Sequence, residues 1–176
     1  MTISSILSNR VIICGYGRVG RSAALSLQQN DRPALVIEKD EKAIELALSE
    51  GHLVLNGDAS KDDVLREARI EQASGVLVCA GDDALNLFIV LSARALNPSL
   101  HIVARSMNPE NESKMRQAGA DRVVSPYRIG GRHMANIMLR PHVTDFFDVV
   151  TLENGQELWV EELIIQPGSR LAGHLG

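Results

Sequence analysis

Six short apolar runs at regular intervals constrain the fold of this 176-residue chain more than any other feature. Successive runs begin 19 to 26 residues apart, and helical patterns of apolar residues fill the intervals. Continuous apolarity, rather than alternation, indicates strands that are buried on both faces, as in a parallel sheet covered by helices. Each interval can hold one strand, one crossover helix and two short loops. The runs are Val11–Cys14, Ala34–Ile37, Leu53–Leu55, Val76–Cys79, Ile102–Ala104 and Val123–Val124.

This repeat predicts an α/β fold with six βα units in a Rossmann-like, doubly wound parallel sheet. Right-handed crossovers leave few topologies, and the strand order that we expect is 3-2-1-4-5-6. Local signals mark some helix ends: Ser60 is a candidate N-cap for a helix over 61–68, and Gly119 ends a helix over 110–118. We assign residues 9–127 to this domain.

The pattern changes after the sixth run. We expect one more helix over 129–139, within a crossover segment at 128–141. Beyond it, Asn154-Gly155 separates two apolar, β-prone runs, which is a strong hairpin signal. Residues 142–176 contain too little core to fold alone. We therefore expect them to be the start of a small β-rich C-terminal lobe.

Charge and composition exclude several classes of function. The net charge is −4, and the sequence has no stripe of Lys and Arg, which argues against nucleic-acid binding. Apolar runs stay far shorter than the ~18 residues that span a bilayer, so we expect no membrane span in this chain. The two cysteines, Cys14 and Cys79, lie in strand-like runs, which favours buried thiols in a reducing compartment.

Sequence signals for chemistry are lacking. The five histidines form no metal-ligand spacing with one another, with a cysteine or with a carboxylate cluster, so no metal site is expected. Neither a Gly-x-Ser-x-Gly elbow nor a Walker loop occurs. The residues outside 10–126 are too few for a separate catalytic domain. Binding without catalysis, and hence no catalytic residue, is the favoured interpretation.

A glycine-rich loop is the sharpest local motif, because it follows the first strand directly and opens a helix. Gly15 permits a tight turn, Gly17 allows the backbone to approach a pyrophosphate, and Gly20 allows close packing of helix on strand. The phosphates would bind the free N–H groups at the helix N-terminus. The competing interpretation is a glycine-rich turn without a ligand. The motif reads Gly15-Tyr16-Gly17-Arg18-Val19-Gly20.

Charged residues beside this loop fit a nucleotide. Glu38 ends the second predicted strand 18 residues after Gly20, where a carboxylate can accept both ribose hydroxyls of an adenosine and repel a 2′-phosphate. Lys39, the next residue, weakens this discrimination against a 2′-phosphate. Arg18 could clamp a phosphate or a neighbouring subunit. A solvated residue in the first helical turn is an equal alternative for Arg18.

Polar residues also follow the other strands, at the carboxyl edge where open α/β sheets bind ligands. Asp58 could receive an adenine amine or hold a ribose, or it could be a turn residue. Asp82 and Asn86, which follow Gly81, could face the far half of a dinucleotide, whereas the simpler role for Asp82 is a helix N-cap. Arg105 could neutralise phosphate charge or form a surface ion pair.

Residues 9–140 closely resemble the regulator-of-potassium-conductance (RCK) domain, also called the Trk N-terminal nucleotide-binding domain. Residues 143–176, with GSRLAG at 168–173, look like the start of the family's C-terminal lobe. Ser-Pro-Tyr at 125–127, followed by Gly-Gly-Arg at 130–132, resembles potassium-channel members more than antiporter or uptake-system members. The motifs are GYGRVG at 15–20, the Glu38 strand end, LNGDAS at 55–60, the Asp82–Asn86 segment, HIVAR at 101–105 and AGADRVVSPYRIGGRHMA at 118–135.

The resemblance implies a cytosolic gating module of a bacterial inner-membrane potassium channel. Such modules dimerise, assemble into a ring below the pore, and bind NAD(H), ATP/ADP or calcium. This chain has Arg105 and Met107 where the calcium-gated pattern supplies carboxylates, and Asp58 alone is a poor calcium cage. The cofactor positions implied by the resemblance are Gly15, Tyr16, Gly17, Arg18, Val19, Gly20, Glu38, Asp58, Ala59, Asp82 and Arg105.

Assembly and the wider function leave alternatives open. Met134, Ile137 and Met138 share one face of the helix over 129–139, which fits a homodimer interface, although packing on its own sheet edge competes. The same module could serve a potassium uptake system or a K⁺/H⁺ antiporter. A truncated NAD-dependent oxidoreductase is a weaker alternative, because no His or Lys is obviously placed to act on a nicotinamide.

Overall fold

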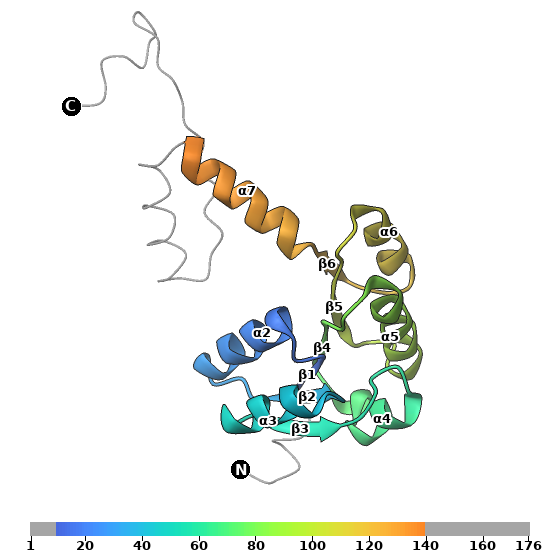
Figure 1. The fold of residues 1–176 in the computed structure, drawn as a ribbon. Helices are drawn as coiled ribbons and strands as arrows, with labels where there is room; N and C mark the ends of the chain where they lie inside the picture. The colour runs from blue at the N-terminus through green and yellow to red at the C-terminus, as the bar shows by residue number, and fades with distance from the viewer. Residues whose placement is uncertain (1–9, 140–176) are drawn as a thin grey trace, which may run out of the picture. The chain divides into compact units, whose positions relative to one another are not determined.

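A six-stranded, all-parallel sheet in the order β3-β2-β1-β4-β5-β6 forms the centre of the computed structural model, which describes residues 10–139 (Figure 1). The predicted fold class and strand order are confirmed. The order reverses between β1 and β4, where the chain leaves one half of the sheet and begins the other. The strands are β1 (Val11–Cys14), β2 (Ala34–Glu38), β3 (Leu53–Asn56), β4 (Gly75–Val78), β5 (His101–Arg105) and β6 (Arg122–Val124).

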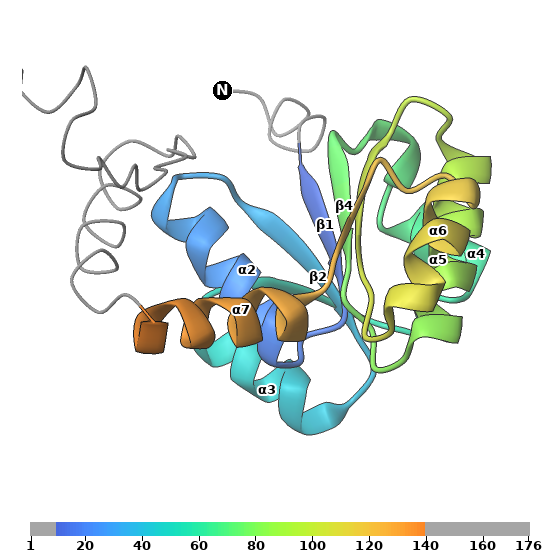
Figure 2. The same ribbon diagram turned by 90° about the horizontal axis from the view of Figure 1, so that it is seen from above.

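Helices cover both faces of the sheet. Figures 1 and 2 show α2 and α3 on one face and α4, α5 and α6 on the other. A short 3-10 helix, Ile70–Gln72, follows α4 and had no sequence signal that we recognised. The helices are α2 (Arg18–Gln29), α3 (Glu41–Ser49), α4 (Asp62–Glu67), α5 (Asp83–Leu96), α6 (Pro109–Gln117) and α7 (Pro126–Leu139).

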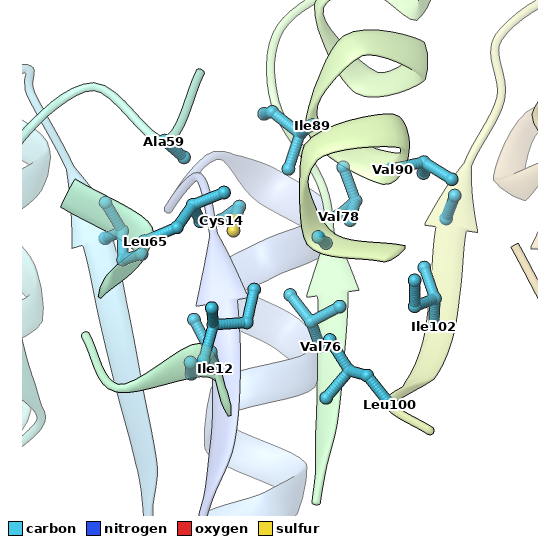
Figure 3. Packing of buried hydrophobic residues seen from close by; sticks show 14 of the residues in the cluster. Ile12, Cys14, Ala59, Leu65, Val76, Val78, Ile89, Val90, Leu100 and Ile102 are labelled. Atoms are coloured by element: carbon cyan, nitrogen blue, oxygen red, sulfur yellow. The ribbon is translucent and has the colours of Figure 1, made fainter. Parts of the chain in front are cut away.

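Alternate residues of β1, β2, β3 and β4 enter two different cores. Ile12 and Cys14 of β1 pack with residues of α4 and α5, as Figure 3 shows, whereas Ile13 belongs to the core beneath α2 and α3. Burial on both faces, expected for all six runs, holds for the central strands β1 and β4. It is wrong for the edge strands β3 and β6, where Leu53 is 54% exposed, because each edge strand has a neighbour on one side only.

Two of the predicted helix ends have different outcomes. Gly119 follows α6 with φ of +116°, a conformation that favours glycine, so the predicted stop is confirmed. The prediction that Ser60 caps the next helix is wrong. α4 begins after Lys61, which makes no side-chain cap, and the Ser60 backbone N–H instead donates to Asp58 Oδ1 at 3.0 Å. Ser60 therefore belongs to the turn at Asp58, and the helix starts only after Lys61.

The predicted helix over 129–139 is present as α7, which begins earlier, at Pro126. A proline suits the first turn of a helix, where its missing N–H leaves no bond unmade. Contacts divide the chain into a unit that ends at Gly130 and another that starts at Gly131. The predicted lobe at 142–176 lies outside the described residues. None of the helices described within 10–139 is long and apolar enough to cross a membrane.

Candidate functional site

A cavity of about 460 Å³ opens at the carboxyl edge of the sheet, around the point where the strand order reverses. Ligands of doubly wound sheets bind at such a point, because the connections on either side run in opposite directions and leave a crevice. The segments that follow β1, β2, β3, β4 and β5 all contribute to its wall. Ten of the sequence-predicted residues line it: Gly15, Tyr16, Gly17, Arg18, Glu38, Lys39, Asp58, Ala59, Gly81 and Arg105.

The other four predicted residues, Val19, Gly20, Asp82 and Asn86, lie outside the cavity lining. Asp82 caps α5, since its carboxylate accepts the Leu85 N–H at 2.8 Å. Asn86 is fully buried, and its amide bonds both polar groups of the Ala80 backbone and the carbonyl of the residue that ends β5. Asn86 thus holds the ends of β4 and β5 that form the wall, and Asp82 caps α5, so neither side chain lines the cavity.

The glycine-rich loop has the backbone geometry that its sequence predicts. Gly15 has φ of +99°, and a Cβ there would lie 2.9 Å from the Cys79 carbonyl oxygen. Gly17 is the N-cap of α2, and a Cβ added to it would meet no atom within 4 Å among the described residues. α2 then begins with Arg18 rather than with an acidic residue. Its first N–H groups are therefore placed to bind an anion.

Glu38 is fixed against this loop by three backbone amides. Its Oε2 accepts the Tyr16 N–H at 2.7 Å, and its Oε1 accepts the N–H groups of Lys39 at 2.7 Å and Asp40 at 3.0 Å. A carboxylate oxygen has two lone pairs, so Oε1 is saturated, whereas Oε2 can accept one more hydrogen bond, from a hydroxyl donor. The same carboxylate thus orders the loop and presents an acceptor to the cavity.

Lys39 and Asp58 form an ion pair at the cavity wall. Lys39 Nζ lies 2.9 Å from Asp58 Oδ2, and both residues line the cavity. The hydrogen bond from the Ser60 backbone, followed by that from Lys39, lowers the pKa of Asp58 to about 2. Asp58 is therefore charged at neutral pH and holds the lysine to one side.

Two arginines border the cavity. Arg105 Nη2 donates to the carbonyl oxygens of Ala80 and Gly81, at the end of β4. Arg18 Nη2 donates to the Tyr127 hydroxyl at 3.0 Å in an exposed position. The contact of Arg105 is with backbone carbonyls, which places its positive charge at the cavity without neutralising it.

Sequence reasoning missed what lies beneath the loop. The Tyr16 side chain is 2% exposed and packs in the core under α2 and α3, so its sequence position in the motif did not reveal its role. Its hydroxyl donates to Glu50 Oε2 at 2.6 Å, and Glu50 also accepts from the guanidinium of Arg21. The Tyr16 ring lies edge-on to His52, with centroids 5.5 Å apart. The loop is therefore anchored to the C-terminal end of α3.

Acid titration should report this anchor. The hydrogen bonds from Arg21 and Tyr16 lower the pKa of Glu50 from 4.5 to about 2. A carboxyl whose pKa is lower in the folded state stabilises the fold above pH 4.5, and that contribution disappears as the pH falls toward 2. We expect Glu50→Gln to flatten the fall of the unfolding free energy in this window, measured by urea denaturation.

The matched control is Glu45→Gln, at an exposed position of the same helix, which should keep the slope of the wild type. An acid limb that is equally steep in the Glu50→Gln variant would mean that the link from Tyr16 to Glu50 does not stabilise the fold.

The floor of the cavity contains two cysteines that sequence reasoning assigned only to the core. Cys14 and Cys79 both line the cavity, and both are free thiols. Burial raises the pKa of Cys79 to about 11 and that of Cys14 further, so both are uncharged at neutral pH. Among residues 10–139, no three His, Cys, Asp or Glu side chains gather as they would around a metal ion. These two thiols thus add no charge to the cavity lining.

Comparison with known proteins identifies the family. The family model described as the TrkA-N domain matches residues 11–126, which include the whole sheet and the helices α2 to α6. The chain belongs to the TrkA-N domain family. Its six strands and the glycine-rich loop all fall within the matched residues. The resemblance inferred from the motifs is confirmed.

The relatives of this TrkA-N domain include potassium channel and potassium uptake proteins. It is 41% identical to Potassium channel protein 1 of Methanocaldococcus jannaschii over 155 residues, which are 86% of this chain and 46% of that protein. It is 32% identical to a Trk system potassium uptake protein TrkA homolog of Methanothermobacter thermautotrophicus, over 77% of this chain and 62% of that one. The chain spans about half the length of the potassium channel relatives that it matches.

Solved structures of a similar fold include nucleotide complexes. GsuK bound to ADP is 34% identical, with a TM-score of 0.67, over 76% of this chain and 34% of that one. The GsuK channel bound to NAD is 26% identical, with a TM-score of 0.66, over 71% of this chain and 23% of that one.

Proposed function

We propose that this TrkA-N domain binds an adenine nucleotide, NAD(H) or alternatively ADP or ATP, in the cavity at the carboxyl edge of the sheet. The observation that carries the proposal is the Glu38 carboxylate, fixed by three backbone amides beside the open N-terminus of α2. The carboxylate can accept from ribose hydroxyls and the amides can bind a pyrophosphate, and both groups lie at the same cavity, which supports the proposal. The ADP and NAD complexes of GsuK support it.

The domain would act as the cytosolic sensing part of a potassium channel. The 41% identity to a protein named as a potassium channel favours this role. A regulatory role in a potassium uptake system is the alternative, and the TrkA homologs, at 32% identity in one case, favour it. In either role the domain would bind its ligand without converting it. Binding can bias a gate only if the nucleotide has different affinities for the open and closed states.

A second copy of the chain would cover α7. Met134 and Met138 are 70% and 83% exposed, and Ile137 is 41% exposed. Flexible apolar side chains of this kind suit a docking surface, so they support the homodimer through the helix over 129–139 that the sequence suggests. A ring of such dimers beneath a membrane pore would place the nucleotide sites where they could move the gate.

Calorimetric titration of the full chain with NAD⁺, NADH, ADP and ATP tests the proposal. We expect binding of at least one of these nucleotides, and a loss of at least about tenfold in affinity for Gly17→Ala, because a methyl group would occupy the space that a phosphate approaches. Without ligand, the melting temperature of Gly17→Ala should match that of the wild type, since its Cβ meets open space among the described residues.

Gly130→Ala is the matched control, since a Cβ there also meets no atom within 4 Å among the described residues, outside the cavity lining. It should bind as the wild type does. Absence of heat with all four nucleotides would exclude the proposed function. To separate channel from uptake system, potassium flux through the full-length protein in liposomes should respond to the nucleotide, and this response should be lost in Gly17→Ala.

A further inference from the structure

The position of Lys39 poses a question of selectivity. It follows Glu38 directly at the end of β2, where doubly wound folds bind the ribose of a nucleotide. A carboxylate there accepts the ribose hydroxyls, whereas a nearby cation accommodates a 2′-phosphate. Glu38 and Lys39 side by side would therefore give opposite preferences if both were available to the ligand.

Lys39 is not available, because its ammonium group is held by Asp58. The Nζ–Oδ2 distance is 2.9 Å, and the Asp58 side chain is the less exposed partner, at 32% against 61%. Asp58 is itself held, since its Oδ1 accepts the Ser60 N–H at 3.0 Å. The fixed member of the pair is thus the aspartate, and the flexible lysine is held to it at the cavity wall.

The charges on this side of the cavity sum to −2, from Glu38, Lys39, Asp40 and Asp58. A 2′-phosphate, with a charge of about −1.5 to −2 near neutral pH, would meet a net negative wall and would have to compete with Asp58 for the lysine. Without the Asp58 charge the sum falls to −1, and Lys39 can turn to the phosphate. The carboxylate of Asp58 therefore disfavours a 2′-phosphate in two ways.

We infer that Asp58 is a specificity-determining residue, which excludes 2′-phosphorylated nucleotides by withholding Lys39 from them. This inference rests on the proposed nucleotide binding and narrows its ligand class to adenine nucleotides with a free 2′-hydroxyl. Asp58 acts through Lys39. With the lysine held by Asp58, the Glu38 carboxylate favours a 2′-hydroxyl over a 2′-phosphate and no cation acts against it.

Two ligand pairs that differ only in the 2′-phosphate test the inference: NAD⁺ with NADP⁺, and AMP with adenosine 2′,5′-bisphosphate. The wild type should prefer the member without the 2′-phosphate in each pair. Asp58→Asn should reduce the ratio of the two affinities in each pair by roughly fivefold or more. The effect should be largest at low salt, where the charge of the freed lysine is least screened. Asparagine keeps an oxygen for the Ser60 N–H, so the turn should persist.

Second-site variants show whether Lys39 is responsible. Asp58→Asn combined with Lys39→Met should restore the wild-type preference, whereas Asp58→Asn combined with Lys42→Met should keep the narrowed one, because Lys42 is exposed on α3 and outside the cavity lining. Asp62→Asn, which removes the same charge at the exposed start of α4, should leave the preference at its wild-type value.

Three results would overturn the inference. Equal weakening of both members of a pair by Asp58→Asn would make Asp58 a contact of the part that they share. A narrowed preference that persists without Lys39 would be a general charge effect. A wild type that binds both members of a pair equally well would show no selectivity to explain. A wild type that binds neither pair, by contrast, would remove the proposed function itself.

Discussion

Gly20→Ala is expected to destabilise the domain by about 3 kcal/mol or more, at the upper end of the cost of overpacking. A Cβ built on Gly20 would lie 2.0 Å from the carbonyl oxygen and 3.1 Å from the carbonyl carbon of Gly15. Both atoms are backbone, so no side chain can turn away to make room. Either the first turn of α2 must move away from β1, or the tight turn at Gly15 must change its conformation.

Helix propensity alone would make Gly20→Ala more stable, so a measured loss of stability can be assigned to the clash. Alanine is favoured over glycine inside a helix by about 1 kcal/mol, so the clash has to exceed that gain before any loss of stability is seen. Urea denaturation without ligand measures the net effect. Gly17→Ala, with φ of −75° and open space around its Cβ among residues 10–139, should change the unfolding free energy little.

Alanine substitutions at the two glycines of this motif are therefore predicted to have different effects. Gly20→Ala should lose stability and nucleotide binding together, whereas Gly17→Ala should lose binding alone. If the unfolding free energy of Gly20→Ala lies within about 1 kcal/mol of that of the wild type, the close packing of α2 on the loop would be wrong.

The fold could be predicted because its signals are local and repeated. Each apolar run indicates its own strand, and the handedness of crossovers then leaves few ways to order six of them. The position of the cavity followed from that order, because the carboxyl ends of parallel strands meet at one edge. Ten residues of the cavity lining were predictable in this way, Glu38 and Asp58 among them.

The orientation of individual side chains could not be predicted in the same way. Tyr16 lies within the motif, yet its ring belongs to the core, and its partner Glu50 is 34 residues away along the chain. Asn86 and Asp82 both follow the end of β4. The Asn86 amide bonds backbone groups of Ala80 and Arg105, whereas the Asp82 carboxylate caps α5. A sequence pattern gives the position of a residue, whereas the pairing of polar groups across elements depends on packing that no local spacing encodes.

Asp83→Ala is expected to cost about 3 kcal/mol, because it removes the acceptor of several partly buried donors and of the buried Ser106 hydroxyl at once. The Asp83 carboxylate accepts the backbone N–H groups of Met107 at 2.8 Å and Asn108 at 3.0 Å. It also accepts the side-chain amide of Asn111 at 2.9 Å. One acidic residue at the start of α5 thus holds the segment between β5 and α6, where Met107 lines the cavity.

Its neighbour provides the control. Asp82→Asn keeps a good helix N-cap, since asparagine caps about as well as aspartate, and should cost less than about 0.5 kcal/mol. Urea denaturation of both variants at pH 7 separates the two adjacent aspartates. Nucleotide affinity should also fall in Asp83→Ala, because the segment that contains Met107 loses its attachment. Equal costs for the two variants would mean that the segment is held by other contacts.

The cost of Asp83→Ala should also depend on pH. Burial disfavours the charged carboxylate of Asp83, but the hydrogen bonds from Asn111, Met107 and Asn108 outweigh burial and lower its pKa below the usual 3.8. A lowered pKa means that this group stabilises the fold fully above pH 3.8 and loses its contribution as the pH falls through the folded pKa. The gap in unfolding free energy between wild type and Asp83→Ala should therefore be constant from pH 7 to 5 and shrink below it. A gap that stays constant down to pH 2 would show that the charge of Asp83 does not hold the segment, and that only its volume matters.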